Sequence, residues 1–96
     1  MKPEKNNASL DDVIKEQMND PEFAKAWAET ELEDQVKRSI IQARIDAGLT
    51  QKELAKVSGI RQSNISRIES GAAVPTLKTL YAIAKGTGKT LKITFE

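Results

Sequence analysis

Apolar residues recur at helical spacing along most of this chain, which predicts a mainly helical protein. The first pattern predicts a short helix from Leu10 to about Met18. Ser9 is its expected N-cap, because a serine hydroxyl can accept a hydrogen bond from a backbone N–H at a helix start. Val13 and Ile14 lie on the apolar side of this helix.

A longer helical pattern follows and begins at Asp20 and Pro21. Asp20 suits the N-cap position, and Pro21 suits the first helical position because an N–H there would have no helical partner. The pattern extends to Gly48, which predicts the helix end, and the acidic run at residues 30–34 favours a break within it. Its apolar positions are Phe23, Trp27, Val36, Ile40 and Ala43.

Three shorter helices are predicted downstream. The first starts after Thr50, which forms a capping box with Glu53, and ends at Gly59. The second covers about residues 62–69, and the third begins after Thr76, another residue suited to an N-cap. The residues expected on the buried sides of these helices and in the turn between the first two are Leu54, Ala55, Val57, Ile60, Ile65, Ile68, Leu77, Leu80, Tyr81, Ile83 and Ala84.

The end of the chain reads LKITF at residues 91–95, and its alternation of apolar and polar residues predicts a β-strand. One side of this strand carries Leu91, Ile93 and Phe95, which we interpret as dimerisation residues. No other strand is predicted, so its backbone groups need a partner from outside the chain. A second copy could pair antiparallel to give a two-fold homodimer, or the strand could extend another protein's sheet. A third alternative is an extended tail that lies on the domain.

The spacing within residues 51–68 is typical of a helix-turn-helix. When Gln51 is counted as the first position, the fifth is the small residue Ala55 and the ninth is Gly59. A small fifth residue lets two helices approach, and the ninth position needs a backbone conformation that suits glycine. The tenth, fifteenth and eighteenth positions supply a shared apolar core, and they are Ile60, Ile65 and Ile68.

With this motif, the chain resembles the Cro and phage-repressor type of helix-turn-helix, the Xre family. The resemblance covers residues 43–88, ARIDAGLTQKELAKVSGIRQSNISRIESGAAVPTLKTLYAIAKGTG. It implies that the second motif helix, RQSNISRIE at residues 61–69, enters the DNA major groove. The fold class expected is mainly α: a five-helix Cro/repressor-like bundle with an N-terminal helical extension and one C-terminal β-strand that pairs in a dimer.

The side of residues 61–69 away from the isoleucines is expected to meet DNA. Amide side chains suit adenine, and an arginine can bind guanine through two hydrogen bonds. The expected base contacts are Gln62, Ser63, Ser66 and Arg67, and the expected phosphate contacts are Gln51, Arg61, Asn64 and Arg44. The matching arginine and glutamate of the family form an ion pair, so the resemblance also implies a structural pair between Arg44 and Glu69.

The composition removes several kinds of site. The chain has no cysteine and no histidine, which excludes disulfides, thiolate or imidazole metal ligands and histidine-based catalysis. The segment KGTGKT resembles the end of a phosphate-binding loop, but that motif requires a glycine where Ile83 stands. No enzyme activity, cofactor, metal or small-molecule ligand is therefore expected. The absence of a signal peptide or a membrane-length apolar run predicts a cytoplasmic protein without a membrane partner.

Charge divides the chain into two parts of opposite sign. Residues 1–36 hold four lysines and ten acidic residues, whereas residues 37–96 hold eleven basic and four acidic residues. The corresponding net charges are −6 and +7. A basic part suits a polyanion such as double-stranded DNA, and an acidic part suits a basic partner. The alternative is that the acidic part is only solvated or folds onto the basic part.

The acidic arm makes the chain similar to the HigA-type antitoxins, over most of residues 20–95. This resemblance implies a protein that binds and neutralises a small basic HigB-type toxin, which cleaves messenger RNA, and that represses its own operon at a palindromic operator. It also implies a homodimer and a heterotetramer with the toxin. The candidate toxin-binding residues are Leu10, Val13, Ile14, Met18, Phe23 and Trp27, and the alternative is that they pack against the chain's own helices.

The domain organisation follows from these assignments. Residues 1–36 form the acidic helical extension and candidate toxin-binding arm, residues 37–88 form the helix-turn-helix domain, and residues 89–96 form the dimerisation strand. The competing hypothesis is a stand-alone Xre-type dimeric repressor in which residues 1–36 only extend the dimer interface.

Overall fold

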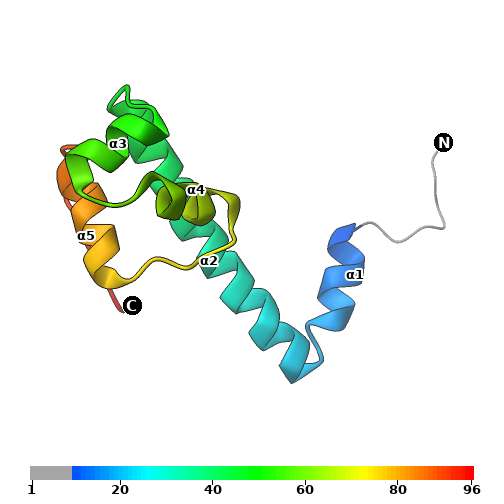
Figure 1. Ribbon diagram of the computed structural model, residues 1–96. Helices are drawn as coiled ribbons and strands as arrows, with labels where there is room; N and C mark the ends of the chain where they lie inside the picture. The colour runs from blue at the N-terminus through cyan, green and yellow to red at the C-terminus, as the bar shows by residue number, and fades with distance from the viewer. Residues whose placement is uncertain (1–9) are drawn as a thin grey trace. The chain divides into compact units, whose positions relative to one another are not determined.

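The computed structural model describes residues 10–96, and this part of the chain contains five α-helices (Figure 1). The N-cap predicted at Ser9 lies outside the described residues. The chain divides into two compact units, Met1–Leu32 and Glu33–Glu96. The helices are α1 (Leu10–Gln17), α2 (Pro21–Asp46), α3 (Gln51–Ser58), α4 (Gln62–Ser70) and α5 (Leu77–Gly86).

The structure confirms the predicted start of α2, but it does not contain the break that was expected within this helix. Asp20 accepts a hydrogen bond at Oδ1 from the backbone N–H of Glu22 at 2.9 Å, and the helix begins at Pro21. The prediction of a break at residues 30–34 was wrong, because α2 continues through them as one helix of 26 residues. This run contains no glycine or proline, and glutamate and leucine are good helix formers.

The start of α3 is fixed by the predicted capping box. The Glu53 backbone N–H donates to Thr50 Oγ1 at 3.0 Å, and the Thr50 backbone N–H donates to Glu53 Oε1 at 2.8 Å. The carboxylate therefore accepts a hydrogen bond that favours its charged form, and the pKa of Glu53 is lowered by this bond. At the other end of α3, Gly59 adopts a left-handed conformation with φ 75°, which glycine reaches without steric cost.

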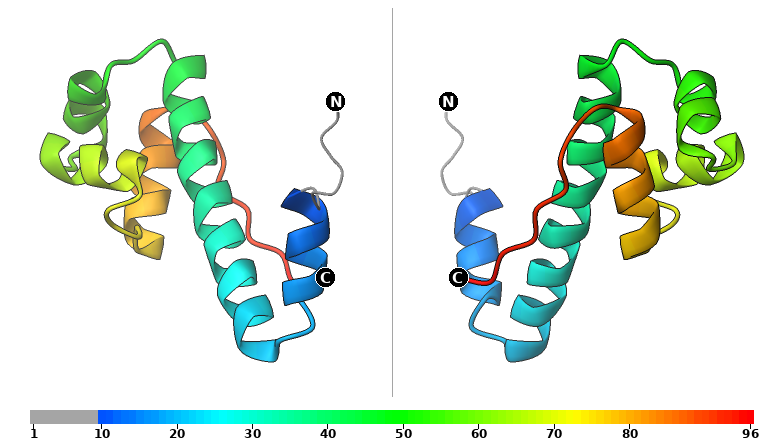
Figure 2. Two further views of the ribbon diagram at one scale, coloured as in Figure 1. Left: turned by 90° about the vertical axis from the view of Figure 1, so that its right-hand side faces the viewer. Right: turned by 90° about the vertical axis from the view of Figure 1, so that its left-hand side faces the viewer.

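The core lies in the second unit, where α3, α4 and α5 gather around the C-terminal part of α2 (Figure 2). Each of these four helices contributes at least one buried side chain. The short helices therefore depend on one another, because each buries only part of an apolar strip. The buried cluster is Ile40, Leu54, Ile65, Ile68 and Ile83, with Val36, Leu49, Ala55, Ile60, Ala73 and Leu80 packed against it.

Three residues that were expected to be buried are exposed. Val57 is 54% exposed, Leu77 is 60% exposed and Tyr81 is 57% exposed. The apolar strip of α5 is wider than the surface that α3 and the rest of the core cover, so its outer edge stays open. Helical periodicity identifies an apolar face, but only the neighbouring helices decide how much of that face is covered.

Gly86 has a packing role beyond ending α5. A Cβ atom built at Gly86 would lie 3.1 Å from Cγ2 of Val57 and 3.5 Å from the Cα of Ser58. The missing side chain therefore lets the end of α5 approach α3 closely.

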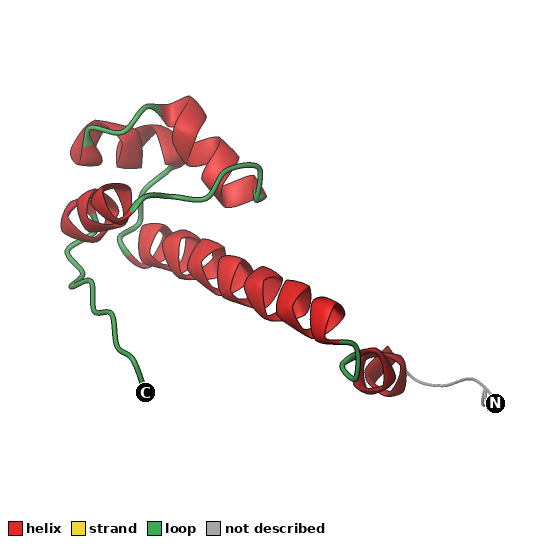
Figure 3. Ribbon diagram, turned by 90° about the horizontal axis from the view of Figure 1, so that it is seen from below, coloured by secondary structure: helices red, strands yellow, loops and turns green. Residues whose placement is uncertain are grey.

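The described residues 10–96 contain no β-strand (Figure 3). Residues 89–96 follow α5 without helix or ladder, and residues 90–96 form no backbone–backbone hydrogen bond with any described residue. Leu91 is half-buried, whereas Ile93 is 59% exposed and Phe95 is 98% exposed. The C-terminal strand and the dimer stay predictions about an assembly of more than one chain.

Candidate nucleic-acid interface

Helices α3 and α4 are joined by a tight turn that presents α4 with one open face. Ile60 in this turn packs against the core, and its backbone N–H donates to Ser58 Oγ at 3.3 Å. Arg61 precedes α4 with an extended backbone, and its side chain does not cap the helix. The first turn of α4 contains no acidic residue, so the positive end of the helix dipole is not neutralised from within that turn.

The two faces of α4 differ sharply in exposure. Ile65 is 0% exposed and Ile68 is 2% exposed, which anchors one face to the core. The side chains on the opposite face make no hydrogen bond or ion pair with other described residues, apart from that of the terminal Ser70. All four expected base contacts and two of the expected phosphate contacts are among these exposed residues: Gln62, Ser63, Ser66, Arg67, Arg61 and Asn64.

A charged network connects α2, α3 and α4 at the edge of this face. Arg44 binds Glu69 through two hydrogen bonds, from Nε to Oε2 at 2.8 Å and from Nη2 to Oε1 at 3.0 Å. Arg44 Nη1 also donates to the backbone carbonyl of Leu49 at 2.9 Å. Gln51 Nε2 donates to Glu69 Oε1 at 3.0 Å. One carboxylate at the end of α4 therefore holds the end of α2 and the start of α3.

This network is largely shielded from water. The Arg44 side chain is 18% exposed and that of Glu69 is 5% exposed. The hydrogen bond to Glu69 raises the pKa of Arg44, with a further contribution from the charge of Glu69. The pair is bidentate, which fixes the angle of both groups as well as their distance.

The other two candidates for phosphate contacts, Arg44 and Gln51, lie in this network and not on the open face of α4. Arg44 and Gln51 use their donors within the network, so their first role in the folded chain is to hold helices together. The contacts from Gln51 to Glu69 and from Arg44 to the Leu49 carbonyl were missed by sequence reasoning. No local signal encodes the first contact, because Gln51 and Glu69 lie 18 residues apart, whereas the second is a local contact between residues five positions apart around the end of α2.

The candidate toxin-binding residues all belong to the first unit, and none is part of the buried cluster. Leu10 is 76% exposed, and Val13 and Met18 are each 39% exposed. The rings of Phe23 and Trp27 are stacked, with centroids 6.2 Å apart and an interplanar angle of 28°. The two rings cover each other in part and stay half-buried, as does Ile14.

Residues 10–96 also lack two other kinds of feature, a cluster of metal-binding side chains and a membrane-spanning helix. No group of three or more acidic residues in this part of the chain is placed to hold a metal ion. No helix among the same residues combines the length and the apolar character that crossing a membrane requires.

Comparison with known proteins gives a family match that covers the helices described above. The helix-turn-helix family matches residues 40–93, more than half of the chain. A protein of Haemophilus influenzae described as an uncharacterized HTH-type transcriptional regulator is 41% identical over 56 residues, covering 58% of this chain and 57% of the relative. The multiprotein-bridging factor 1a of Arabidopsis thaliana is 34% identical over 58 residues, covering 60% of this chain and 41% of the relative.

The chain thus spans about half the length of these curated relatives. No solved structure matches it.

Proposed function

Because this chain belongs to the helix-turn-helix family, we propose that it is a DNA-binding transcriptional regulator whose α4 enters the major groove. The observation that supports this most is the open face of α4, which carries amides, hydroxyls and an arginine whose side chains have no partners among residues 10–96. A face that only met water would not need these groups in place of lysine and glutamate. Gln62, Ser63, Ser66 and Arg67 read base edges in this proposal.

Phosphate contacts fix the position of α4 on the duplex. Arg61 and Asn64 have exposed side chains beside the start of α4, where the helix dipole also favours an anion. Gln51 contributes through the start of α3, and Arg44 contributes mainly by holding Glu69. A two-fold homodimer would place two α4 helices in successive major grooves of a palindromic operator, with half-site centres roughly 34 Å apart.

The finer proposal is an antitoxin that also represses its own operon in the cytoplasm. Three features support it: the resemblance to HigA-type antitoxins, the charge of −6 on residues 1–36, and the apolar residues exposed on the first unit. A small basic HigB-type toxin would be attracted by the acidic arm, and aromatic side chains such as Phe23 and Trp27 could supply the binding energy. Toxin and antitoxin would form a heterotetramer around the antitoxin dimer.

The experiment that tests the antitoxin is purification of the tagged protein expressed from its native locus with the flanking genes. Mass spectrometry of the co-purifying chains should identify a stoichiometric small basic protein. Deleting residues 1–32, which make up the first unit and leave the core-packed Val36 in place, should release that protein while leaving DNA binding intact. Double substitution of Phe23 and Trp27 by alanine should weaken its capture, whereas Arg67→Ala, as the matched control, should weaken DNA binding alone.

A second candidate function is a stand-alone dimeric repressor. The specific observation that favours it is the extent of the family match, which begins at residue 40 and leaves the acidic arm outside. This alternative predicts that the purified protein carries no partner and still binds its own promoter.

A further inference from the structure

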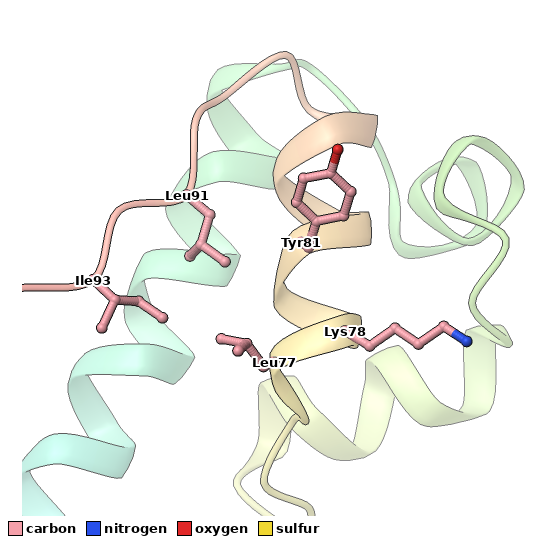
Figure 4. Close-up of a pocket in the computed structure, with 5 residues that line it drawn as sticks. All are labelled: Leu77, Lys78, Tyr81, Leu91 and Ile93. Carbon is pink, nitrogen blue, oxygen red and sulfur yellow. The ribbon is translucent and has the colours of Figure 1, made fainter.

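A hollow beside α5 lies along the segment for which a dimer is predicted. Its volume is about 570 Å³, and its walls are mainly apolar (Figure 4). The lining residues are Leu77, Lys78 and Tyr81 from α5 and Leu91 and Ile93 from the C-terminal segment. Because Leu91 and Ile93 are already candidate dimerisation residues, the hollow adds no function beyond that prediction.

A different feature, the carboxylate of Glu69, accepts hydrogen bonds from two other helices. Arg44 on α2 donates to both of its oxygens, at 2.8 and 3.0 Å. Gln51, the half-buried first residue of α3, donates from Nε2 to Oε1 at 3.0 Å. Arg44 already ties α2 to the end of α4 through two bonds, so the third bond acts mainly on the side chain of Gln51.

The chemistry of the two groups fixes the orientation of the Gln51 amide. An ionised carboxylate only accepts hydrogen bonds, whereas an amide carries two N–H donors on its nitrogen and an acceptor oxygen. If the amide were turned by half a turn, its oxygen would face a carboxylate oxygen with no hydrogen between them. Glu69 therefore holds the donor end of Gln51 and excludes the reversed orientation.

One donor of this amide stays available. The nitrogen uses one N–H on Glu69, and its second N–H has no acceptor among residues 10–96. Arg44 lies against Glu69 and balances its charge, so the carboxylate repels an approaching phosphate less than an unpaired one would. The network therefore presents an oriented, uncharged N–H donor at the start of α3.

We propose that Glu69 is a positioning residue for DNA binding, because it orients the Gln51 amide so that its second N–H donates to a backbone phosphate. This inference rests on the proposed function, in which Gln51 contacts a phosphate at the start of α3. Arg44 balances the charge, Glu69 selects the amide orientation and Gln51 makes the contact. An amide that is already oriented avoids part of the entropy cost of ordering a side chain on binding.

This contact differs measurably from that of a basic side chain. The amide is uncharged, so losing it should leave the dependence of affinity on salt unchanged. A phosphate contact carries no base information, so its loss should weaken binding to the operator and to random DNA by the same factor. Arg61→Ala, in contrast, should lower the salt dependence.

A double-mutant cycle on promoter DNA tests the positioning role. Gln51→Ala should weaken binding about tenfold. Glu69→Gln keeps the size of the side chain but lets either end of the Gln51 amide face it, and it should weaken binding about fivefold. In the Gln51→Ala background, Glu69→Gln should cost less than about twofold, because no amide is left to orient.

Gln62→Ala is the matched control, since Gln62 is also an amide of the helix-turn-helix and has no hydrogen bond to Glu69. Glu69→Gln should cost the same factor with and without it. All variants are compared at a temperature at which circular dichroism shows them folded. If Glu69→Gln costs the same factor in the wild-type and Gln51→Ala backgrounds, Glu69 only holds the helices together and the proposal is overturned.

NMR of the Gln51 side-chain amide measures the orientation directly. In the free chain, one of its two protons should lie downfield of the other because it bonds to a carboxylate. Promoter DNA should then shift the second proton. Glu69→Gln should remove the first effect and reduce the second, and a second proton that does not respond to DNA would overturn the contact.

The same titrations separate this inference from the proposed function. A wild-type chain that binds no promoter DNA would overturn both. A chain that binds promoter DNA but shows no coupling between Gln51 and Glu69 would overturn the positioning role alone and leave the regulator standing.

Discussion

Removing the carboxylate of Glu69 should destabilise the helix-turn-helix more than any surface substitution on α4. In the folded chain this carboxylate accepts two hydrogen bonds from Arg44 and one from Gln51. Glu69→Ala removes all three and leaves the Arg44 guanidinium without its counter-charge. The fold should survive, because the apolar cluster around Leu54 and Ile65 does not include Glu69.

The magnitude follows from the burial of the pair. Breaking one partner of a buried ion pair costs about 3 to 5 kcal/mol, because the remaining charge stays desolvated. The Arg44 side chain keeps 18% of its surface in water and still donates to the Leu49 carbonyl, so the lower end of the range applies. The expected loss is therefore about 3 kcal/mol for Glu69→Ala. Glu69→Gln should lose about half as much, since its amide oxygen can still accept one hydrogen bond.

Urea unfolding followed by circular dichroism measures this loss. With a slope of about 1.5 kcal/mol per molar urea, Glu69→Ala should lower the midpoint by about 2 M. Asp34→Ala is the control, because the Asp34–Lys37 pair is 3.7 Å long and exposed, and such pairs contribute about 0 to 1 kcal/mol. A loss below about 1 kcal/mol for Glu69→Ala, or equal stability of the alanine and glutamine variants, would refute the reasoning about the network.

Three further predictions concern DNA binding and pH. Arg67→Ala should reduce affinity most at one base pair per half-site, by roughly 1 to 3 kcal/mol in a binding assay with substituted operators, and an equal loss on random DNA would remove its base-reading role. Arg61→Ala should lower the salt dependence of binding by about one unit without changing sequence preference, and an unchanged slope would exclude a phosphate contact. Hydrogen bonds from Gln42 and Lys89 lower the pKa of Asp46 in the folded chain. The charged carboxylate therefore stabilises the fold fully at pH values above its ordinary pKa. This stabilisation is lost as the pH falls through the lowered pKa of the folded state. Lys89→Ala should therefore reduce the loss of stability between neutral and acidic pH, and identical pH profiles would contradict this assignment.

Local signals in the sequence were sufficient for the starts of α3 and α5 and for the end of α3. The Thr50–Glu53 capping box and the left-handed Gly59 are properties of short stretches, because their hydrogen bonds and backbone angles involve neighbours in the chain. The spacing that placed Ile65 and Ile68 on one face of α4 is local in the same sense. These features predicted a helix-turn-helix, and the family match over residues 40–93 confirms it.

The sequence was less informative about which apolar side chains are buried, because burial depends on the helices that pack against them. Val57, Leu77 and Tyr81 share the apolar periodicity of buried neighbours and are nevertheless exposed, since the elements packed beside them cover only part of each side chain. The expected break in α2 was wrong because dense acidic residues alone do not interrupt a helix of good helix formers.

The sequence by itself thus determined the helices, their caps, the helix-turn-helix spacing and the opposite charges of the two parts of the chain. These depend on residue type and on separations of a few positions, where backbone geometry is nearly fixed. Only the tertiary structure decided that Gln51 joins the expected Arg44–Glu69 pair, that the end of α5 packs at Gly86 against Val57, and that α5 and the C-terminal segment enclose a hollow. These contacts join residues far apart in the chain, and packing against neighbouring helices selects them from many that the same pattern would allow.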